Sequence, residues 1–401
     1  MKLGHFDPDV LLSVGAEYLS MVKEFTDVDN SKVKRDEYRI VFKEHNASKL
    51  GMTVREVQAE LKKIGFYTGV INGLCGFGTS SAIRLFQEYV NSIEGIHCVA
   101  DGDFGPATKG HLDRWLSKTE FPLWTQIMRA WAAGDIAGTE YSDWLQFLGA
   151  VKQKYTGNES RVLQRVSTFK SNVDNAKTTS TRALHEWDFS TDDIHLIGIR
   201  RNEFQGKFDD IFVLLLKGMV FKFQGSTEPG AKSKERTTFP FLVHSQHEYQ
   251  FGWHRSSYLA LRPKGFLDEG KGVLVLRTAS KHPTEEEMNN GELESNGSIN
   301  IHSGHDGKDE IGGESHGCQV INENLYMAPG NAIIPKRNAY HVLMDLVIAL
   351  SGDLTKIDKN GNEVRNTSVK YMMLLEDDLT PEFRSHLENA KQKGIEELGI
   401  A

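Results

Sequence analysis

The 401-residue chain contains no run of about 18 or more apolar residues, so no segment predicts a helix that spans a bilayer. Basic residues do not dominate its charge, because 47 Lys and Arg oppose 55 Asp and Glu for a net charge of −8. It also has no basic stripe interleaved with aromatic residues, and together these absences argue against nucleic acid as a partner. Three cysteines are too few to build a disulfide scaffold in a chain of this length.

The N-terminus lacks the basic segment and the continuous apolar segment of a secretory signal. Lys2 is followed by charged Asp7 and Asp9, and the apolar pair Leu11 and Leu12 is interrupted at once. We therefore expect a protein that is made in the cytoplasm without a signal peptide.

Three cysteines cannot all pair with one another, so at least one is free or bonded outside the chain. Cys75 and Cys98 lie close enough in the sequence to bridge in an oxidising compartment, but buried free thiols are the favoured interpretation. Cys318 lies far from both and is the odd cysteine.

The length and the patterning predict a multidomain α+β protein. Residues 1–46 predict a helical N-terminal arm, 47–118 a small helical domain, 119–190 a helical linker region, and 191–401 a mostly-β domain that ends in helices. From about residue 193, short alternating runs separated by Gly, Pro and charged turns favour a β-sandwich or a barrel-like sheet. The hydrophilic stretch 281–296 is expected to be an exposed loop.

The small helical domain contains an internal near-repeat. Its first copy includes Ile71-Asn72-Gly73 and Thr79, and the second includes Asp101-Gly102 and Thr108. Asn-Gly and Asp-Gly supply the positive φ of a tight turn, and each Thr stands where a helix begins. This doubled spacing resembles the peptidoglycan-binding domain found on many wall hydrolases and transpeptidases. The resemblance implies docking on glycan or stem peptide, which makes peptidoglycan the expected partner.

The segment 298–321 carries the clearest chemical pattern. An alternating strand ends at His302-Ser303, a Gly-rich loop follows, and Ser315-His316-Gly317 then leads to Cys318. A thiol becomes a strong nucleophile when a neighbouring His takes its proton. A turn with Gly before the Cys can direct backbone N–H groups inward, which suits an oxyanion hole. Ser303 is placed to orient the His302 ring, as the third member of a triad does.

This pattern resembles the L,D-transpeptidase (YkuD-type) catalytic domain, in which His-Gly or His-Ser precedes Ser/Thr-His-Gly-Cys by a loop of similar length. The resemblance implies a mostly-β sandwich with Cys318 as the acylated nucleophile and His302 as the general base. It also implies that Ser303 steadies that His through its carbonyl or its hydroxyl. Ser315, His316 and Gly317 then form the turn and the oxyanion hole. The implied substrate bond joins meso-diaminopimelate to D-Ala in the stem peptide, and neither a metal nor an organic cofactor is expected.

Two positions depart from that family's pattern. Val320 stands two residues after the Cys, where the family usually has Arg or Asn, and Gln319 precedes it as a candidate substrate contact. The family's early Ser-Thr-Gly turn has only Gly225-Ser226-Thr227 as a loose counterpart. The outcome can therefore be transpeptidation, D-amino-acid exchange or L,D-carboxypeptidase hydrolysis.

A second histidine group is expected to lie on one β-hairpin. It comprises His244, His247 and His254, with Tyr249, Trp253 and Arg255. Ordinary sheet packing is the default interpretation. The functional alternative is that His254 and Arg255 line the substrate cleft, with Arg255 or Arg262 supplying the carboxylate partner missing at Val320.

Two other functional interpretations stay open. His302, His305, Asp309 and His316 form a candidate zinc set, although the second half of a zinc peptidase pattern is absent and zinc needs three or four converging ligands. Alternatively, the chain is a non-catalytic peptidoglycan-binding component of a phage or a secretion machine, with Cys318 a small buried residue. A wall-acting enzyme without a signal peptide must reach the periplasm by another route. We therefore predict that such an enzyme is a lysin or an antibacterial effector. Its further partners would be an immunity protein or a secretion-machine component.

Overall fold

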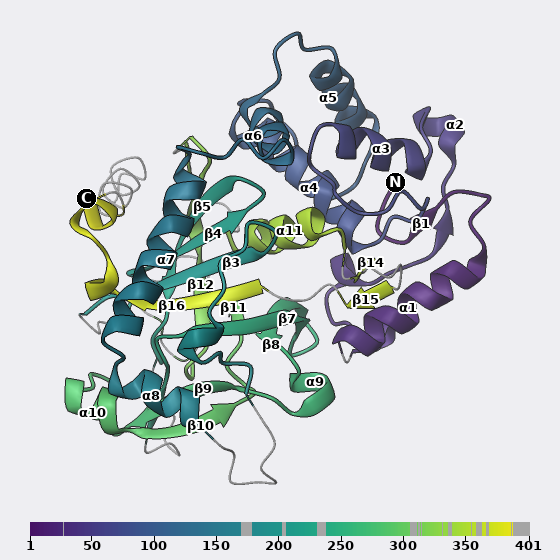
Figure 1. Ribbon diagram of the computed structural model, residues 1–401. Coiled ribbons are helices and arrows are strands. Elements are labelled where there is room, and N and C mark those ends of the chain that lie inside the picture. Colours follow the sequence, from purple (N-terminus) through teal and green to yellow (C-terminus); the bar gives the residue numbers. More distant parts are fainter. Residues whose placement is uncertain are drawn as a thin grey trace. The chain divides into compact units, whose positions relative to one another are not determined.

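The computed structural model describes residues 1–26, 28–169, 179–202, 206–230, 238–304, 311, 313, 315–330, 332–335, 339–353, 355–357, 363–365, 369–385 and 387. The chain forms two compact units (Figure 1). Unit 1 comprises Met1–Asp135, Phe251–Leu259 and Val342–Thr367, and unit 2 comprises Ile136–Gln250, Ala260–His341 and Ser368–Ala401.

Unit 1 is mainly helical. Its helices are α1 (Leu12–Thr26), α2 (Ala47–Leu50), α3 (Val54–Lys63), α4 (Phe77–Ser92), α5 (Pro106–Leu116), α6 (Leu123–Ala132) and most of α11 (Ala339–Ser351). Its short strands are β1 (His5–Phe6) paired with β2 (Lys43–Glu44), and β14 (Thr355–Ile357) paired with β15 (Glu363–Arg365).

The expected N-terminal arm packs onto the small helical domain. Asp7 accepts hydrogen bonds from the backbone N–H groups of Val54 and Arg55, at 2.6 and 3.0 Å, and so caps the start of α3. Helix α6, from the expected linker, belongs to the same core because the Trp124 ring stacks on Phe66 with centroids 4.3 Å apart. The first two expected segments thus share one unit, whereas the expected linker divides at Asp135 and the 191–401 segment contributes Phe251–Leu259 and Val342–Thr367 to unit 1.

Unit 2 is built on β-strands. They are β3 (Ile194–Arg200), β4 (Asp210–Leu216), β5 (Met219–Ser226), β6 (Phe239–Leu242), β7 (Gln246–His254), β8 (Tyr258–Pro263), β9 (Val273–Thr278), β10 (Glu292–Asn296), β11 (Ile301–Ser303), β12 (Gln319–Ala328), β13 (Ala332–Pro335) and β16 (Val369–Leu375). Its helices include α7 (Glu140–Gly157), α8 (Arg161–Thr168), α9 (Phe266–Glu269) and α10 (Glu285–Asn290). The tip of the β7–β8 hairpin belongs to unit 1.

Nine of these strands form one mixed sheet in the order β11-β8-β7-β16-β3-β4-β5-β12-β13. An additional parallel pairing of β11 with β12 joins the two ends of this order into a ring, with β13 continuing from β12. A separate three-stranded sheet has the order β10-β9-β6. In this closing pair of strands, β11 contains His302, and β12 begins directly after Cys318.

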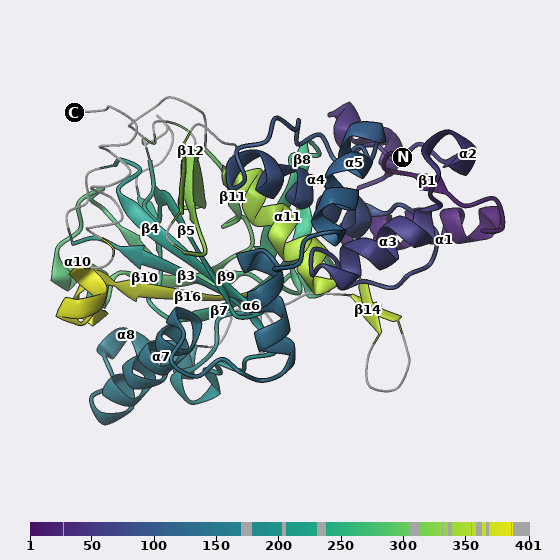
Figure 2. The same cartoon turned by 90° about the horizontal axis from the view of Figure 1, so that it is seen from above.

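Helix α7 covers one face of the large sheet in both views (Figures 1 and 2). Trp144, Phe147 and Leu148 of α7 pack with alternate residues of the central strands, among them Ile197, Val213 and Met372. The intervening residues of the same strands, such as Tyr371 and Phe212, point to the other face because side chains alternate along a strand. Helix α8 packs instead on the small sheet, where Val162 and Val166 contact Leu274 and Leu276.

These features confirm the prediction of a multidomain α+β chain with a helical N-terminal part and a β-rich C-terminal part. The sandwich implied by the family resemblance stays a prediction. The stretch 281–296 is not a loop, because it forms α10 and β10. Cys75 and Cys98 are both buried free thiols. Within the described part of the chain, no helix is long and apolar enough to cross a membrane.

Candidate functional site

Two parallel strands position the predicted nucleophile and base. His302 lies in β11 opposite Val320 of β12, and Ile301 lies opposite Gln319. Cys318 directly precedes β12, and the Gln319 N–H donates to the Asn300 carbonyl at 2.9 Å. Neighbouring strands of one sheet thus fix the backbone on both sides of the candidate pair. On the other side of β12, Val320 lies opposite Ser226 of the loose Ser-Thr counterpart.

Ser315 holds the turn that leads to Cys318. Its hydroxyl oxygen accepts from the Gly317 N–H at 3.1 Å and lies 2.9 Å from the Cys318 carbonyl oxygen and 3.0 Å from that of Glu228. Ser315 is fully buried. It therefore acts within the turn, and the Gly317 N–H is directed to Ser315 rather than to an outside acceptor.

Position 317 of the turn requires glycine. Its φ is +108°, and a Cβ there would lie 2.6 Å from the Cγ of Pro240 and 2.8 Å from the Pro240 carbonyl oxygen. Positive φ is costly for residues with a Cβ. The predicted need for Gly before the Cys is explained by this combination of backbone strain and close packing.

The His302 ring is oriented by a backbone carbonyl. Its Nδ1 lies 2.8 Å from the carbonyl oxygen of Ser303. A carbonyl oxygen only accepts, so Nδ1 carries the proton and Nε2 has the lone pair that a general base needs. The ring is 3% exposed, which restricts it to this orientation.

The Ser303 hydroxyl has a different partner. Its Oγ lies 2.8 Å from the Gly304 carbonyl oxygen and contacts the carboxylate of Glu323, which is 5% exposed. Of the two routes by which Ser303 was expected to steady His302, the carbonyl is the one that touches the ring. Glu323, on β12, had not been singled out from the sequence.

The Cys318 thiol is a partly exposed free thiol. Its Sγ donates to the Ser298 carbonyl oxygen at 3.3 Å. Ser298 precedes β11, so the thiol in this arrangement bridges the ends of the two strands.

A buried polar cluster supports the turn from behind. The Glu228 side chain is 2% exposed and accepts from the Gly206 N–H at 2.9 Å. Burial, and then the neighbouring Asp210, raise the pKa of Glu228 to about 8. Burial likewise raises the pKa of Asp210 to about 6. The Glu228 backbone carbonyl, 3.0 Å from the Ser315 hydroxyl, joins this cluster to the Cys318 turn.

Gln319 does not reach the surface, contrary to its expected role as a substrate contact. It is fully buried, its Oε1 accepts from the Tyr371 hydroxyl at 2.8 Å, and its Nε2 donates to the Gly317 carbonyl at 3.3 Å. The side chain points into the sheet interior, where Tyr371 lies, and the adjacent Val320 therefore points to the opposite face.

The second histidine group divides between the units. His254 and Arg255 lie at the tip of the β7–β8 hairpin in unit 1, where Arg255 and Ser256 have φ of +52° and +57°. This confirms the predicted hairpin. Cys318 and His302 belong to unit 2, so the substrate role of His254 and Arg255 stays a prediction.

His244 and His247 are structural residues of unit 2. The His247 ring lies 2.9 Å from both the Thr181 hydroxyl and the Val243 carbonyl oxygen, and His244 lies 3.1 Å from the Ser160 hydroxyl. Burial lowers the pKa of His244 to about 4 and that of His247 to about 3. Both are therefore neutral, hydrogen-bonded core residues, as the default interpretation predicted.

The zinc alternative falls partly outside the described residues, since His305 and Asp309 do. Among the residues that are described, no group of three or more His, Cys, Asp or Glu side chains is placed to hold a metal ion.

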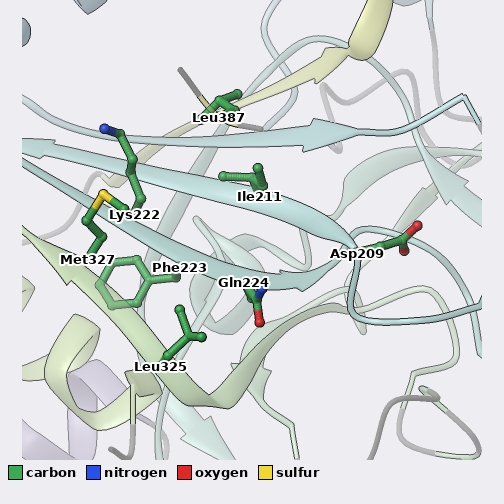
Figure 3. Close-up of a pocket in the computed structure, with 8 residues that line it drawn as sticks. All are labelled: Asp209, Ile211, Lys222, Phe223, Gln224, Leu325, Met327 and Leu387. Atoms are coloured by element: carbon green, nitrogen blue, oxygen red, sulfur yellow. The ribbon is translucent and has the colours of Figure 1, made fainter. Parts of the chain in front are cut away.

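A pocket lies elsewhere on unit 2 (Figure 3). It is lined by Asp209, Ile211, Lys222, Phe223, Gln224, Leu325, Met327 and Leu387. These residues come mainly from β4, β5 and β12, and neither Cys318 nor His302 is among them. The lining is mostly apolar, so this pocket offers no chemistry to the candidate pair.

In unit 1, the two copies of the near-repeat share one hydrogen-bond arrangement. In the first copy, Gln58 Nε2 donates at 3.0 Å to Asn72 Oδ1, the Leu74 carbonyl and Thr79 Oγ1. In the second, Gln87 Nε2 donates at 3.0 Å to Asp101 Oδ1, the Asp103 carbonyl and Thr108 Oγ1. Each Gln Oε1 also accepts from the turn glycine, Gly73 or Gly102. One buried amide thus ties each turn to the start of the following helix.

Comparison with known families agrees with this repeat. Residues 51–112 match the family described as "Putative peptidoglycan binding domain". The chain carries a peptidoglycan-binding domain. The match covers both copies of the repeat.

A curated relative matches over part of the chain. The spore cortex-lytic enzyme of Oceanobacillus iheyensis is 36% identical over 78 residues, which is 19% of this chain and 27% of that enzyme. The chain therefore spans about a quarter of the length of this relative.

A solved structure from Clostridium acetobutylicum, titled as a fused Zn-dependent amidase/peptidase/peptidoglycan-binding domain-containing protein, aligns over 81% of this chain and 97% of its own. Its sequence identity to this chain is 14%, and the TM-score of the alignment is 0.23.

Proposed function

We propose that this protein is a peptidoglycan-acting cysteine acyltransferase in which Cys318 attacks a stem-peptide carbonyl and His302 serves as general base. One observation carries the proposal: the Cys318 turn and His302 lie at the ends of two directly paired strands, with the His302 Nδ1 held by a carbonyl. The peptidoglycan-binding domain supports the choice of substrate. The finer assignment, L,D-transpeptidase-type chemistry at the bond between meso-diaminopimelate and D-Ala, rests on the resemblance of segment 298–321.

In the proposed reaction, the Cys318 thiol first leaves the Ser298 carbonyl by rotation about its side chain. His302 Nε2 takes the thiol proton while Sγ bonds to the substrate carbonyl carbon, whose oxygen gains the negative charge. The C–N bond to the leaving amine then breaks, and His302 returns the proton to that amine. A thioester on Cys318 remains.

The thioester is resolved by a second nucleophile. The amine of another stem peptide gives a 3–3 cross-link, a free D-amino acid gives an exchanged stem, and water gives a trimmed tripeptide. His302 takes the proton of the incoming nucleophile and returns it to the thiolate. Delivery to the wall as a lysin or an effector is part of the same proposal.

Analysis of muropeptides tests the proposed function. Purified peptidoglycan treated with the wild type should yield cross-linked, exchanged or trimmed stems by mass spectrometry, and Cys318→Ala and His302→Ala should yield none. If the wild type binds peptidoglycan but leaves every muropeptide unchanged, the protein is a binding component instead. If product forms with Cys318→Ala and disappears with a chelator, the zinc alternative holds.

A further inference from the structure

We propose that Gln319, held by the hydroxyl of Tyr371, fixes the peptide bond between Gly317 and Cys318 so that the Cys318 N–H is directed at the oxyanion. Both are positioning residues, since neither touches the substrate. The inference rests on the proposed acyl transfer at Cys318 and adds the way in which the transition state is stabilised.

The side-chain amide of Gln319 uses both of its ends inside the sheet. Its Oε1 accepts from Tyr371 at 2.8 Å, and its Nε2 donates to the Gly317 carbonyl at 3.3 Å. Because a carbonyl oxygen only accepts, Nε2 of Gln319 must face Gly317, and Oε1 is left for the Tyr371 hydroxyl, which donates to it. Without the Tyr371 bond, the Oε1 end of the amide loses the partner that holds it, and the bond from Nε2 to the Gly317 carbonyl is less firmly positioned.

The orientation of one peptide group follows from this bond. In a trans peptide, the C=O of residue 317 and the N–H of residue 318 point in opposite directions. Since the Gly317 carbonyl points inward to Gln319, the Cys318 N–H points away from the buried amide. That is the direction required of a donor to a tetrahedral intermediate formed at the Cys318 sulfur.

This peptide needs an external constraint. Gly317 has no Cβ and a φ of +108°, so its backbone is among the least restricted in the turn. Its own N–H already donates to Ser315. The Cys318 N–H is the next donor along the chain, and Gln319 supplies the bond that holds its peptide group.

The position of Tyr371 is itself determined by the sheet. Its ring stacks against Phe212, with centroids 6.2 Å apart. A Cβ at Gly198, on the neighbouring strand β3, would overlap the Tyr371 hydroxyl. Gly198 thus leaves the space in which this hydroxyl lies.

Tyr249 provides a matched control within the same interior. Its ring packs edge-on against Tyr371 at 5.7 Å, and it is fully buried as well. Among the described residues, the hydroxyl of Tyr249 has no hydrogen-bond partner. Removing either hydroxyl leaves the ring packing in place, but only Tyr371→Phe releases Gln319.

The experiment compares two reactions of Cys318 in the full-length protein. Acylation by a carbapenem passes through an oxyanion, whereas alkylation by iodoacetamide is a displacement that forms none. We expect Gln319→Met to slow acylation about 100-fold, and Tyr371→Phe to slow it about 10-fold, the range found when an oxyanion donor is weakened or lost. Alkylation rates and their pH profiles should stay within about 2-fold of wild type, and Tyr249→Phe should match wild type in both reactions.

A second measurement does not depend on catalysis. The amide ¹H–¹⁵N resonance of Cys318 should shift or split in Gln319→Met, because its peptide group gains a second orientation, and should not change in Tyr249→Phe. An unchanged Cys318 resonance in Gln319→Met overturns the inference, whether or not the wild type is acylated. Failure of the wild type to be acylated counts instead against the proposed function. Acylation that survives in both variants, or alkylation that falls in parallel with it, also overturns the inference.

Discussion

Ser303 contributes to the site through two different atoms. Its carbonyl oxygen fixes the His302 ring, whereas its hydroxyl contacts Glu323 and the Gly304 carbonyl. A backbone atom is present whatever the side chain, so these two contributions can be separated by mutation.

Ser303→Ala should therefore keep the base in place. We expect Cys318 acylation to remain within about 3-fold of wild type, with a loss of about 1–3 kcal/mol in the free energy of unfolding, because the buried Glu323 loses a partner. His302→Ala is the comparison that should abolish acylation. A loss of acylation in Ser303→Ala as large as that in His302→Ala would show that the hydroxyl orients the ring.

Gly317→Ala tests the turn itself. A Cβ at a φ of +108° and against Pro240 must displace the backbone next to Cys318. Misplacement of a reacting group by about 1 Å costs roughly 100-fold in rate, so we expect acylation to fall by about that factor. Gly313→Ala is the matched control, since a Cβ there meets nothing within 4 Å. Equal rates for the two variants would contradict this account of the turn.

At the scale of elements, the peptidoglycan-binding domain depends on two glutamines in equivalent places. Each one joins a turn to a helix start through a buried amide, with the same spacing to its partners in both copies. The resemblance in the sequence therefore has a physical basis in a repeated hydrogen-bond arrangement.

Gln58→Ala and Gln87→Ala should each destabilise unit 1 by about 3 kcal/mol, because several buried backbone groups of the turn lose their partner. The free energy of unfolding and the retention on peptidoglycan should both fall. Gln126→Ala, which removes an exposed glutamine of α6, should change neither. Wild-type stability of both buried-glutamine variants would mean that these bonds are not needed for the repeat.

How far the sequence could predict each element depended on how local its signal was. The strands β3, β4 and β5 were predictable as short apolar or alternating runs, and the β7–β8 hairpin was predicted around the second histidine group. The stretch 281–296 was mistaken for a loop, although Thr284 and Glu287 form a capping box that starts α10. β10 is polar because it lies at the edge of the small sheet, so it has no apolar alternation to detect.

The sequence predicted only those residues of the candidate site that lie close together in one segment of the chain. Cys318, His302 and the Gly317 turn lie within 20 residues of sequence. Tyr371 and Glu228 reach the turn from β16 and from the end of β5, and their roles depend on strand pairings between distant segments. Gln319 was expected at the surface because strand alternation alone does not say which face is interior.

At the scale of the whole molecule, buried ionisable groups make stability depend on pH in both directions. The pKa of Glu228 is raised from 4.5 to about 8, so its contribution is fully present below pH 4.5 and is lost as the pH rises to about 8. The pKa of His247 is lowered from 6.5 to about 3, so its contribution is present above pH 6.5 and is lost as the pH falls toward 3. Stability should therefore decline toward both ends of the pH range.

Glu228→Gln should remove the alkaline part of this decline, because a neutral amide replaces an acid that must ionise. We expect the melting temperature of the variant to exceed that of wild type at pH 9 and to match or fall below it at pH 5. Thermal denaturation at both pH values measures the difference, with Glu285→Gln, which changes an exposed residue of α10, as control. A constant difference between Glu228→Gln and wild type across this range would contradict the raised pKa.

The central claim is that Cys318 carries an acyl group from the stem peptide, and intact-protein mass spectrometry tests it most directly. The protein is mixed with tetrapeptide muropeptides, quenched in acid within seconds, and then digested to locate the modified residue. We predict an adduct on Cys318 equal to the muropeptide minus D-Ala, absent from Cys318→Ala and from His302→Ala. The contrary result is an unmodified Cys318, or an equal adduct on Cys75 or Cys98, under conditions in which the wild type remains folded and bound to peptidoglycan.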